Sequence, residues 1–397
     1  MTKFGRRYFI FLIILLGALS AFGPFVTDMY LPTLPSLAEV FHSTPSLVQM
    51  GLSMSMLGLA VGQVFFGPIS DKYGRRRVLI VSMVLFALST MMCIFSPDIE
   101  TFNLCRFLQG LGGSGGLVLS CSVATDCYSG RELAKMLAII GAVNGIAPVC
   151  APVVGGLVSE SIGWQGIFWI LFGIGVVLFF MCLVFRESLP RERRYVGNIF
   201  GLLKNFSKLL KLKYFVIYTI LYAFANGILF SYISSASFII QNEFGYSELM
   251  FAVFFAVNSV GVGLGSALSL RFSRMPSAAI TGAVMIAVSI LVQWFFVISG
   301  PQFWAYEAMI FIMLTGAGLI FTAATALAMD EGRAMTGMAS AIYGACGFLA
   351  GSIVSPLVGI GNIMTTTLTL LSICVFGVLI FARIAYKRTD AKSKQEV

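Results

Sequence analysis

Long apolar segments separated by short polar connections dominate this chain of 397 residues. A helix that crosses about 30 Å of hydrocarbon needs about 20 mostly apolar residues. Continuous apolar runs favour helices, because barrel strands alternate apolar and polar residues over about ten positions. Twelve segments are long enough: 8–36, 46–69, 78–96, 100–125, 134–158, 164–185, 214–241, 246–270, 277–298, 302–328, 335–359 and 363–385. The pattern predicts an all-α membrane protein with twelve transmembrane helices.

The composition agrees with this reading, since 58% of the residues are apolar and only 11% are charged. A soluble domain carries about 25% charged residues, and single soluble cores stop growing near about 250–300 residues. A large soluble enzyme is therefore excluded, and we expect no enzymatic activity. The eight cysteines do not have metal-ligand spacing and His42 is the sole histidine. We therefore expect neither a metal site nor a cofactor.

The net charge of +9 is explained by topology. Every Lys and Arg except Arg106 lies at the N-terminus, in the tail, or in or beside the even-to-odd connections between segments. The opposite connections carry only acids, namely Glu39, Asp98, Glu100, Glu160, Glu243 and Glu248. The positive-inside rule then puts both termini in the cytoplasm. No nucleic-acid partner is expected.

The chain divides into two halves at its single long polar connection, residues 187–213. We expect one six-helix bundle in residues 1–186 and a second in 214–397, a range that includes a short cytoplasmic tail. Residues 141–156 and 344–359 repeat each other, with Gly141/Gly344, Ala142/Ala345, Ala147/Ala350 and Gly156/Gly359 in register. Two parallel six-helix repeats are the architecture of transporters whose halves rock about a central site.

The connection after the second segment carries a motif with a physical rationale. Gly67 allows close helix approach, Gly74 permits a tight turn, and Asp71 can bond Arg75 four residues on. An ordinary basic connection is the alternative. Residues 67–79 resemble motif A of the major facilitator superfamily, with Ile69 in place of Leu. This resemblance implies a charge cluster of Asp71, Arg75 and Asp126 that controls conformation and does not bind substrate.

Asp28 and Arg106 are the two charges that the pattern places well inside apolar segments. Residues 104–112, around Arg106, resemble motif B of the same superfamily. A charge in hydrocarbon is costly and is a functional-site hypothesis by default. The two residues lie at comparable depth, which permits direct or water-bridged contact and suits proton coupling. A structural ion pair, or snorkelling of Arg106 to the interface, is the alternative.

The end of the first segment identifies a branch of the superfamily. Residues 27–35, Thr-Asp-Met-Tyr-Leu-Pro-Thr-Leu-Pro, resemble the bicyclomycin/chloramphenicol-resistance (Bcr/CflA-type) drug/proton antiporters. The fifth segment resembles the antiporter motif C, with a hinge role expected for Gly145, Pro148, Pro152 and Gly156.

The resemblance implies efflux of drugs in exchange for protons by alternating access in the bacterial inner membrane. The expected partners are a small-molecule substrate, protons and the lipid bilayer, and the chain is expected to act as a monomer. Export of an endogenous metabolite or amino acid is the alternative function.

One departure from related multidrug transporters concerns the number of acids. Some relatives carry a second acid one to two turns before the aspartate, where this chain has Ser20, Ala21 and Phe22. A single interior acid suggests one proton per cycle. Glu307, near the outer start of the tenth segment, could substitute, but we expect it to be a solvated interfacial residue.

Candidate substrate contacts combine aromatic and polar side chains. The candidates are Asp28, Arg106, Tyr30, Asn258 and Tyr343, together with Tyr222, Asn226 and Phe230. The last three are spaced four residues apart and lie on one helix face. Such a wall would suit flat, moderately lipophilic compounds. Ordinary helix packing is the alternative for each aromatic residue.

Overall fold

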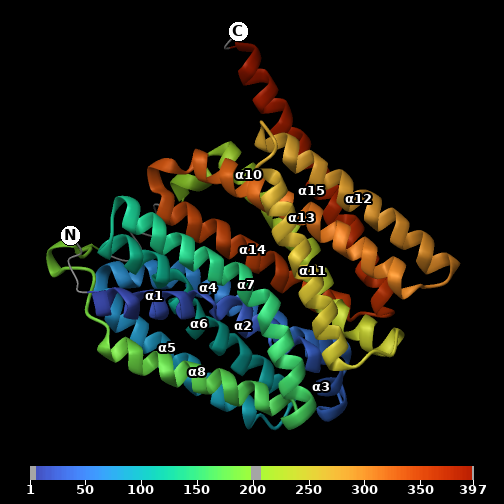
Figure 1. Ribbon diagram of the computed structural model, residues 1–397, viewed down its shortest axis with the longest axis horizontal. Coiled ribbons are helices and arrows are strands. Elements are labelled where there is room, and N and C mark those ends of the chain that lie inside the picture. Colours follow the sequence, from blue (N-terminus) through green and yellow to red (C-terminus); the bar gives the residue numbers. More distant parts are fainter. Residues whose placement is uncertain (1–5, 198–206, 396–397) are drawn as a thin grey trace. The chain divides into compact units, whose positions relative to one another are not determined.

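The computed structural model describes residues 6–197 and 207–395, and the regular structure in them is helical (Figure 1). Twelve helical segments are long and apolar enough to cross a membrane, one at each predicted position. The predicted fold class is therefore confirmed. The cytoplasmic location of the termini stays a prediction. Lys3, Lys204 and residues 198–206 of the predicted connection lie outside the described residues.

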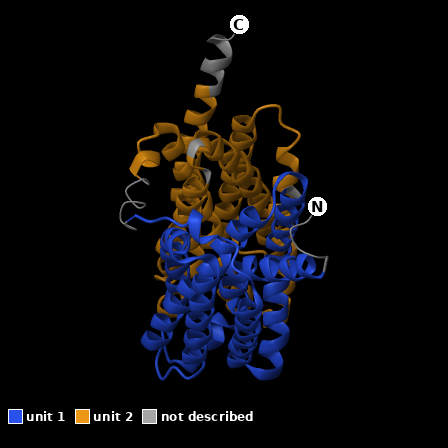
Figure 2. Ribbon diagram, turned by 90° about the vertical axis from the view of Figure 1, so that its left-hand side faces the viewer, with its two compact units in different colours: residues 1–43, 50–204 blue, residues 44–49, 205–397 orange. Residues whose placement is uncertain are grey.

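The chain forms two compact units, coloured separately in Figure 2. Unit 1 comprises residues 1–43 and 50–204, and unit 2 comprises residues 44–49 and 205–397. The assignment of residues 44–49 to unit 2 has a local cause. Gln49 donates from Nε2 to the Ser234 carbonyl at 3.1 Å, and the Ser46 hydroxyl donates to the Pro356 carbonyl at 2.8 Å.

Unit 1 contains the first six membrane spans. Its helices are α1 (Arg6–Ser20), α2 (Phe22–Asp28), η1 (Leu31–Thr33), α3 (Leu34–Val40), α4 (Pro45–Tyr73), α5 (Arg75–Ile94), α6 (Ile99–Cys127), α7 (Gly130–Ile162), α8 (Trp164–Val184) and the short η2 (Arg191–Arg193). The first turn of α4 is the part that belongs to unit 2.

The first span is not the single continuous helix that its apolar run predicts. It breaks after Ser20 and again after Asp28. A helix needs an N–H four residues after each carbonyl, and proline has none. Pro24 therefore cannot bond the Ser20 carbonyl, and Pro32 cannot bond that of Asp28. The second break leaves Asp28 as the last residue of α2.

Unit 2 contains the other six spans and repeats the packing of unit 1. Its helices are α10 (Lys213–Phe238), the π-helical η3 (Ile239–Glu243), α11 (Glu248–Ser269), α12 (Met275–Ser299), α13 (Phe303–Glu331), η4 (Arg333–Met335), α14 (Thr336–Val358) and α15 (Ile363–Gln395). In unit 1 α5 packs on α6 and α8, and in unit 2 α12 packs on α13 and α15. The two units are therefore pseudo-symmetric bundles.

Glycines set the closest helix contacts at matching places in both units. A methyl group at Gly110 of α6 would lie 2.0 Å from the Ser55 carbonyl oxygen of α4, and one at Gly58 2.2 Å from that of Phe107. In unit 2 the corresponding distances are 2.1 Å for Gly318 of α13 and 1.9 Å for Gly265 of α11. Backbones in lipid can approach this closely only where side chains are absent.

Candidate functional site

Arg75 lies at the centre of the predicted charge cluster, entirely within unit 1. Its guanidinium contacts the carboxylates of Asp71 at 2.7 Å and Asp126 at 2.9 Å. Its side chain and that of Asp126 are largely buried, whereas Asp71 is half exposed. The geometry expected from the motif A resemblance is therefore present, and the conformational role of these residues stays a prediction.

The turn between α4 and α5 supports this cluster through a residue that sequence reasoning missed. Gly74 has φ +97°, a backbone conformation that favours glycine, as predicted for a tight turn. Glu187 then accepts hydrogen bonds from the backbone N–H groups of Arg75 at 2.9 Å and Arg76 at 3.3 Å. It satisfies donors that a helix start leaves unpaired.

The expectation that Gly67 brings helices close together is wrong. A methyl group there would make an ordinary contact of 3.8 Å with Val118. The close approach on α4 lies further toward its start, at Gly58 and Gly62, where a methyl group would meet α6 at 2.2 Å and 1.7 Å. Gly58 and Gly62 lie at the crossing with α6, whereas Gly67 lies beyond it.

Asp28 is buried in unit 1, with 5% of its surface exposed. The break before Pro32 holds it at the end of α2, and the Thr27 hydroxyl donates to its Oδ1 at 2.7 Å. No ion pair to Asp28 is present among the described residues.

Arg106 is fully buried on α6, so snorkelling to the interface is excluded. It donates to the Val26 carbonyl at 2.7 Å, to the Ser55 hydroxyl at 3.2 Å and to Gln109 Oε1. Val26 belongs to the last turn of α2, where carbonyls lack partners within the helix. Arg106 therefore ties the end of α2 to α4 and α6.

The sequence-based picture of Arg106 facing Asp28 needs correction. Both side chains are buried in unit 1, but Arg106 bonds the backbone two residues before Asp28 and not its carboxylate. Comparable depth stays a prediction, and depth alone does not say which way a side chain points around its helix.

Tyr30 packs against Arg106 inside unit 1. The guanidinium carbon lies 4.1 Å from the centre of the Tyr30 ring. It also lies 5.6 Å from the centre of the Phe168 ring on α8, which is next to Tyr30. Tyr30 therefore positions Arg106, and its predicted contact with substrate stays a prediction.

Motif C lies on α7, which continues through Pro148 and Pro152 without a break. A methyl group at Gly145 would meet nothing within 4 Å. Gly155 instead makes the close contact, since a methyl group there would lie 1.8 Å from the Met29 carbonyl oxygen. Gly156 beside it is buried. The part of α7 around Gly155 thus packs against Met29, the residue directly after Asp28 at the end of α2.

Four of the predicted pocket residues gather between α10 and α14 in unit 2. The rings of Tyr222 and Tyr343 stack with centres 3.9 Å apart, and the Tyr343 hydroxyl bonds Thr325 at 2.9 Å. Asn226 donates to the Tyr222 carbonyl at 2.9 Å, and Phe230 lies beside Phe348. The fourfold spacing on α10 was interpreted correctly as one face.

Asn258 does not join that face. It is fully buried on α11, where its Nδ2 donates to Glu307 Oε1 at 2.7 Å and to the Tyr232 hydroxyl at 3.0 Å. Glu307 is itself only 8% exposed, so the expectation of a solvated interfacial glutamate is wrong. Asp28 is accordingly not the sole buried acid. The polar Asn258 within an apolar segment was the signal that could have pointed to a buried partner.

Comparisons with known proteins agree with the fold and the motifs. The family profile described as Major Facilitator Superfamily matches residues 13–356. The "Uncharacterized MFS-type transporter YdgK" of Bacillus subtilis is 37% identical over 381 residues, covering 91% of this chain and 94% of that protein. The "Bicyclomycin resistance protein homolog" of Haemophilus influenzae is 28% identical over 359 residues, covering 89% of each.

A solved structure gives the same fold. The xylose transporter XylE from E. coli superposes with a TM-score of 0.75 at 15% identity, covering 96% of this chain and 98% of that one. The twelve spans, the repeated packing and the family match converge on one assignment. This multi-pass membrane protein belongs to the Major Facilitator Superfamily of transporters, in the branch that includes drug-resistance proteins.

Proposed function

We propose that this protein is a secondary active efflux transporter that exchanges protons for drugs or other amphiphilic small molecules by alternating access. The observation that carries the proposal is Asp28, a buried carboxyl held at a helix break in a chain of this family. Ionisable residues inside membrane segments commonly mark ion and substrate pathways.

The surroundings of Asp28 suit competition between a proton and a substrate. A buried carboxylate without a cation partner is costly. Either a proton or a polar or cationic group of the substrate can neutralise it. Arg106 is engaged with Val26, Ser55 and Gln109, and so it holds the local backbone while the carboxyl of Asp28 exchanges its partner. Antiport requires that the proton and the substrate bind the same group in turn and never at the same time.

The α10–α14 face of unit 2 supports an amphiphilic substrate. The stacked rings of Tyr222 and Tyr343 offer flat apolar surface, and Asn226 adds a polar group beside them. Binding sites for drug-sized molecules combine such surfaces with few polar groups. We propose phenicol-like or bicyclomycin-like compounds as the first substrates to test. In unit 2 the proposed contacts are the residues of this face, and in unit 1 they are Asp28, Tyr30 and Arg106.

The charge pattern supports a bacterial inner-membrane location with both termini in the cytoplasm. In that orientation the cluster of Asp71, Arg75 and Asp126 lies at the cytoplasmic ends of α4, α5 and α6. We propose that it controls conformation.

The test uses purified protein in proteoliposomes that contain a pH-sensitive dye. Chloramphenicol or bicyclomycin should move protons through the wild-type protein without Na⁺, and Asp28→Asn should abolish this movement. Asp330→Asn is the matched control, because Asp330 is exposed and paired with Arg333 at 2.8 Å. Full coupling in Asp28→Asn would overturn the assignment. Release of a metabolite from overexpressing cells without drug resistance would favour an endogenous substrate.

A further inference from the structure

A second buried carboxyl group lies in unit 2, on helix α13. Glu307 is 8% exposed, and its only hydrogen bond given by the structure joins Oε1 to Asn258 at 2.7 Å. Its Oε2 is buried without a hydrogen-bond partner. No ion pair to Glu307 exists within residues 6–197 and 207–395. A group with these surroundings is costly as a bare carboxylate.

Among the described residues, the neighbours of Glu307 carry no opposite charge. Helix α10 contributes the Tyr232 phenol, α11 contributes Asn258, and α13 itself contributes Tyr306. Gln293 of helix α12 lines a cavity together with Tyr232 and Tyr306, and the Tyr343 phenol of α14 bonds Thr325 of α13, on another part of that helix. No described neighbour therefore neutralises the charge of Glu307, and its unpaired Oε2 is the atom that can take up a proton.

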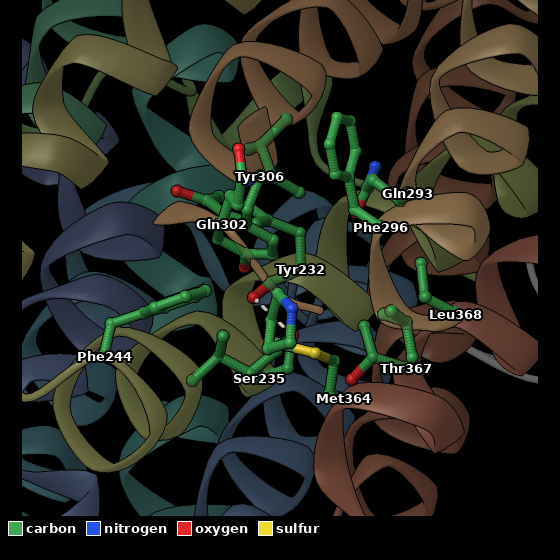
Figure 3. Close-up of a pocket in the computed structure, with 14 residues that line it drawn as sticks. Tyr232, Ser235, Phe244, Gln293, Phe296, Gln302, Tyr306, Met364, Thr367 and Leu368 are labelled. Carbon is green, nitrogen blue, oxygen red and sulfur yellow. Dashed lines mark hydrogen bonds between the residues drawn. The ribbon is translucent and has the colours of Figure 1, made fainter. Parts of the chain in front are cut away.

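A small cavity reaches Tyr232 and Tyr306, the neighbours of Glu307, although Glu307 itself does not line it. It is about 20 Å³ in volume, enough for one water molecule. Tyr232 and Tyr306 line it, and so does Gln293, whose Nε2 is buried without a hydrogen-bond partner (Figure 3). A water molecule there would have polar partners. The cavity therefore offers water, and with it a proton, to the Tyr232 hydroxyl that bonds Asn258.

Asn258 can satisfy Glu307 in both protonation states. As a carboxylate, Glu307 accepts from one Nδ2 proton of Asn258 while Tyr232 accepts from the other. The amide oxygen and nitrogen are interchangeable by a flip of the side chain. With the flip, Oδ1 accepts from a protonated Glu307 on one lone pair and from the Tyr232 hydroxyl on the other. Before the flip, Oδ1 has no hydrogen-bond partner, so the flip breaks no hydrogen bond to this oxygen.

We propose that Glu307, Asn258 and Tyr232 form a second proton-binding site, carried entirely by unit 2. A proton from water forms an O–H bond at a carboxylate oxygen of Glu307, and the same bond breaks when the proton returns to water. Protonation also turns the Tyr232 hydroxyl from the cavity toward Asn258. The inference extends the proposed function, because a second site allows two protons per transport cycle instead of one.

The first test reads protonation directly and needs no transport. Infrared difference spectra between acidic and alkaline pH should contain a carbonyl-stretch band of a buried carboxylic acid. Glu307→Gln should remove this band, and Asp28→Asn should leave it in place. Glu331→Gln is the control on the same helix, because Glu331 is paired with Arg388 at 2.6 Å and should not contribute. An unchanged wild-type spectrum in Glu307→Gln would overturn the proposal.

Tyr232→Phe provides a milder variant that removes a single oxygen atom. It should keep the Glu307 band but shift its frequency, because the protonated acid and Tyr232 share the Asn258 oxygen. An unshifted band would contradict the shared arrangement. In proteoliposomes, the protons exchanged per drug should fall by one in Glu307→Gln. If no drug moves at all, the proposed function fails while the infrared result still decides the site.

Discussion

The guanidinium carbon of Arg106 lies 4.1 Å from the centre of the Tyr30 ring. A cation over an aromatic face is attracted to it, and more strongly where water is excluded, as at this fully buried arginine. The contact joins α6 to Tyr30, which lies two residues after the end of α2 at Asp28. The aromatic ring thus holds the arginine in the position from which it bonds the Val26 carbonyl.

The ring and not the hydroxyl of Tyr30 should therefore matter. Tyr30→Phe keeps the stacked face, and we expect near wild-type stability and transport. Tyr30→Leu removes the cation–π contact and should cost about 1–2 kcal/mol of stability, with a clear loss of transport. Thermal unfolding in detergent and drug-driven proton movement measure the two effects. Equal loss of transport in both variants would instead indicate that the hydroxyl contacts substrate.

Exchange of the two buried charges in unit 1 should not restore activity. Asp28 and Arg106 form no ion pair, and Arg106 bonds the backbone of α2 instead. The double variant Asp28→Arg/Arg106→Asp therefore loses the hydrogen bonds of Arg106 and gains none. We expect its proton-coupled transport to be as low as that of either single variant. Recovery of transport in the double variant would require the direct pair that the structure lacks.

The two carboxylates that bond Arg75 should contribute unequally to stability. Asp126 is 17% exposed and Asp71 is 45% exposed, so water screens the Asp71 pair more strongly. Asp71→Asn should cost less than about 1 kcal/mol, as for surface pairs, and Asp126→Asn about 1–3 kcal/mol, as for buried hydrogen bonds to charge. Thermal unfolding at low and high salt measures both. A larger effect at Asp71 would contradict this order.

Alanine at the glycine crossings should destabilise both units by a similar amount. Gly110→Ala and Gly318→Ala each place a methyl group against a carbonyl oxygen of the neighbouring helix. Overpacking of this kind costs about 1–3 kcal/mol. Gly141→Ala and Gly263→Ala are the controls, because nothing lies within 4 Å of a methyl group at either position. Thermal stability should be unchanged or slightly raised in the controls, and a loss there would point to helix conformation instead.

The helix cap at Asp98 should make a small contribution that depends on pH. The Thr101 N–H donates to the Asp98 carboxylate at 2.7 Å and lowers its pKa. A lowered pKa in the folded state means that the stabilisation exists above the unfolded pKa and disappears as the pH falls through the folded pKa. Asp98→Ala should therefore melt below the wild type at neutral pH and together with it in acid. A constant difference would exclude the charged cap as the cause.

The sequence predicted what depends on local pattern. All twelve spans follow from apolar length alone, and the Asp71–Arg75 contact follows from a spacing of four on a helix. Asp126 was placed correctly because the motif resemblance supplied a long-range partner. The α10 face of Tyr222, Asn226 and Phe230 likewise needed only helix periodicity.

The errors concern tertiary packing, which apolar length does not encode. Glu307 lies near a span end, where solvent is the usual surrounding, but α10, α11 and α13 enclose it together with Asn258. Asp28 and Arg106 are both buried, as expected, yet the guanidinium of Arg106 bonds the Val26 carbonyl and not the Asp28 carboxylate. Glu187 was overlooked because its capping role depends on a connection folding back more than a hundred residues later.

The glycine crossings also determine which helices are able to slide. At Gly58 and Gly110, and again at Gly265 and Gly318, main chain lies directly on main chain, and no flexible side chain is present to yield. The two helices of each crossing pair, α4 with α6 and α11 with α13, are therefore expected to move together as one rigid body. We expect displacement during a transport cycle to come from segments with clearance, such as the part of α7 around Gly141 and Gly145, and not from its later part, where Gly155 lies against the Met29 carbonyl.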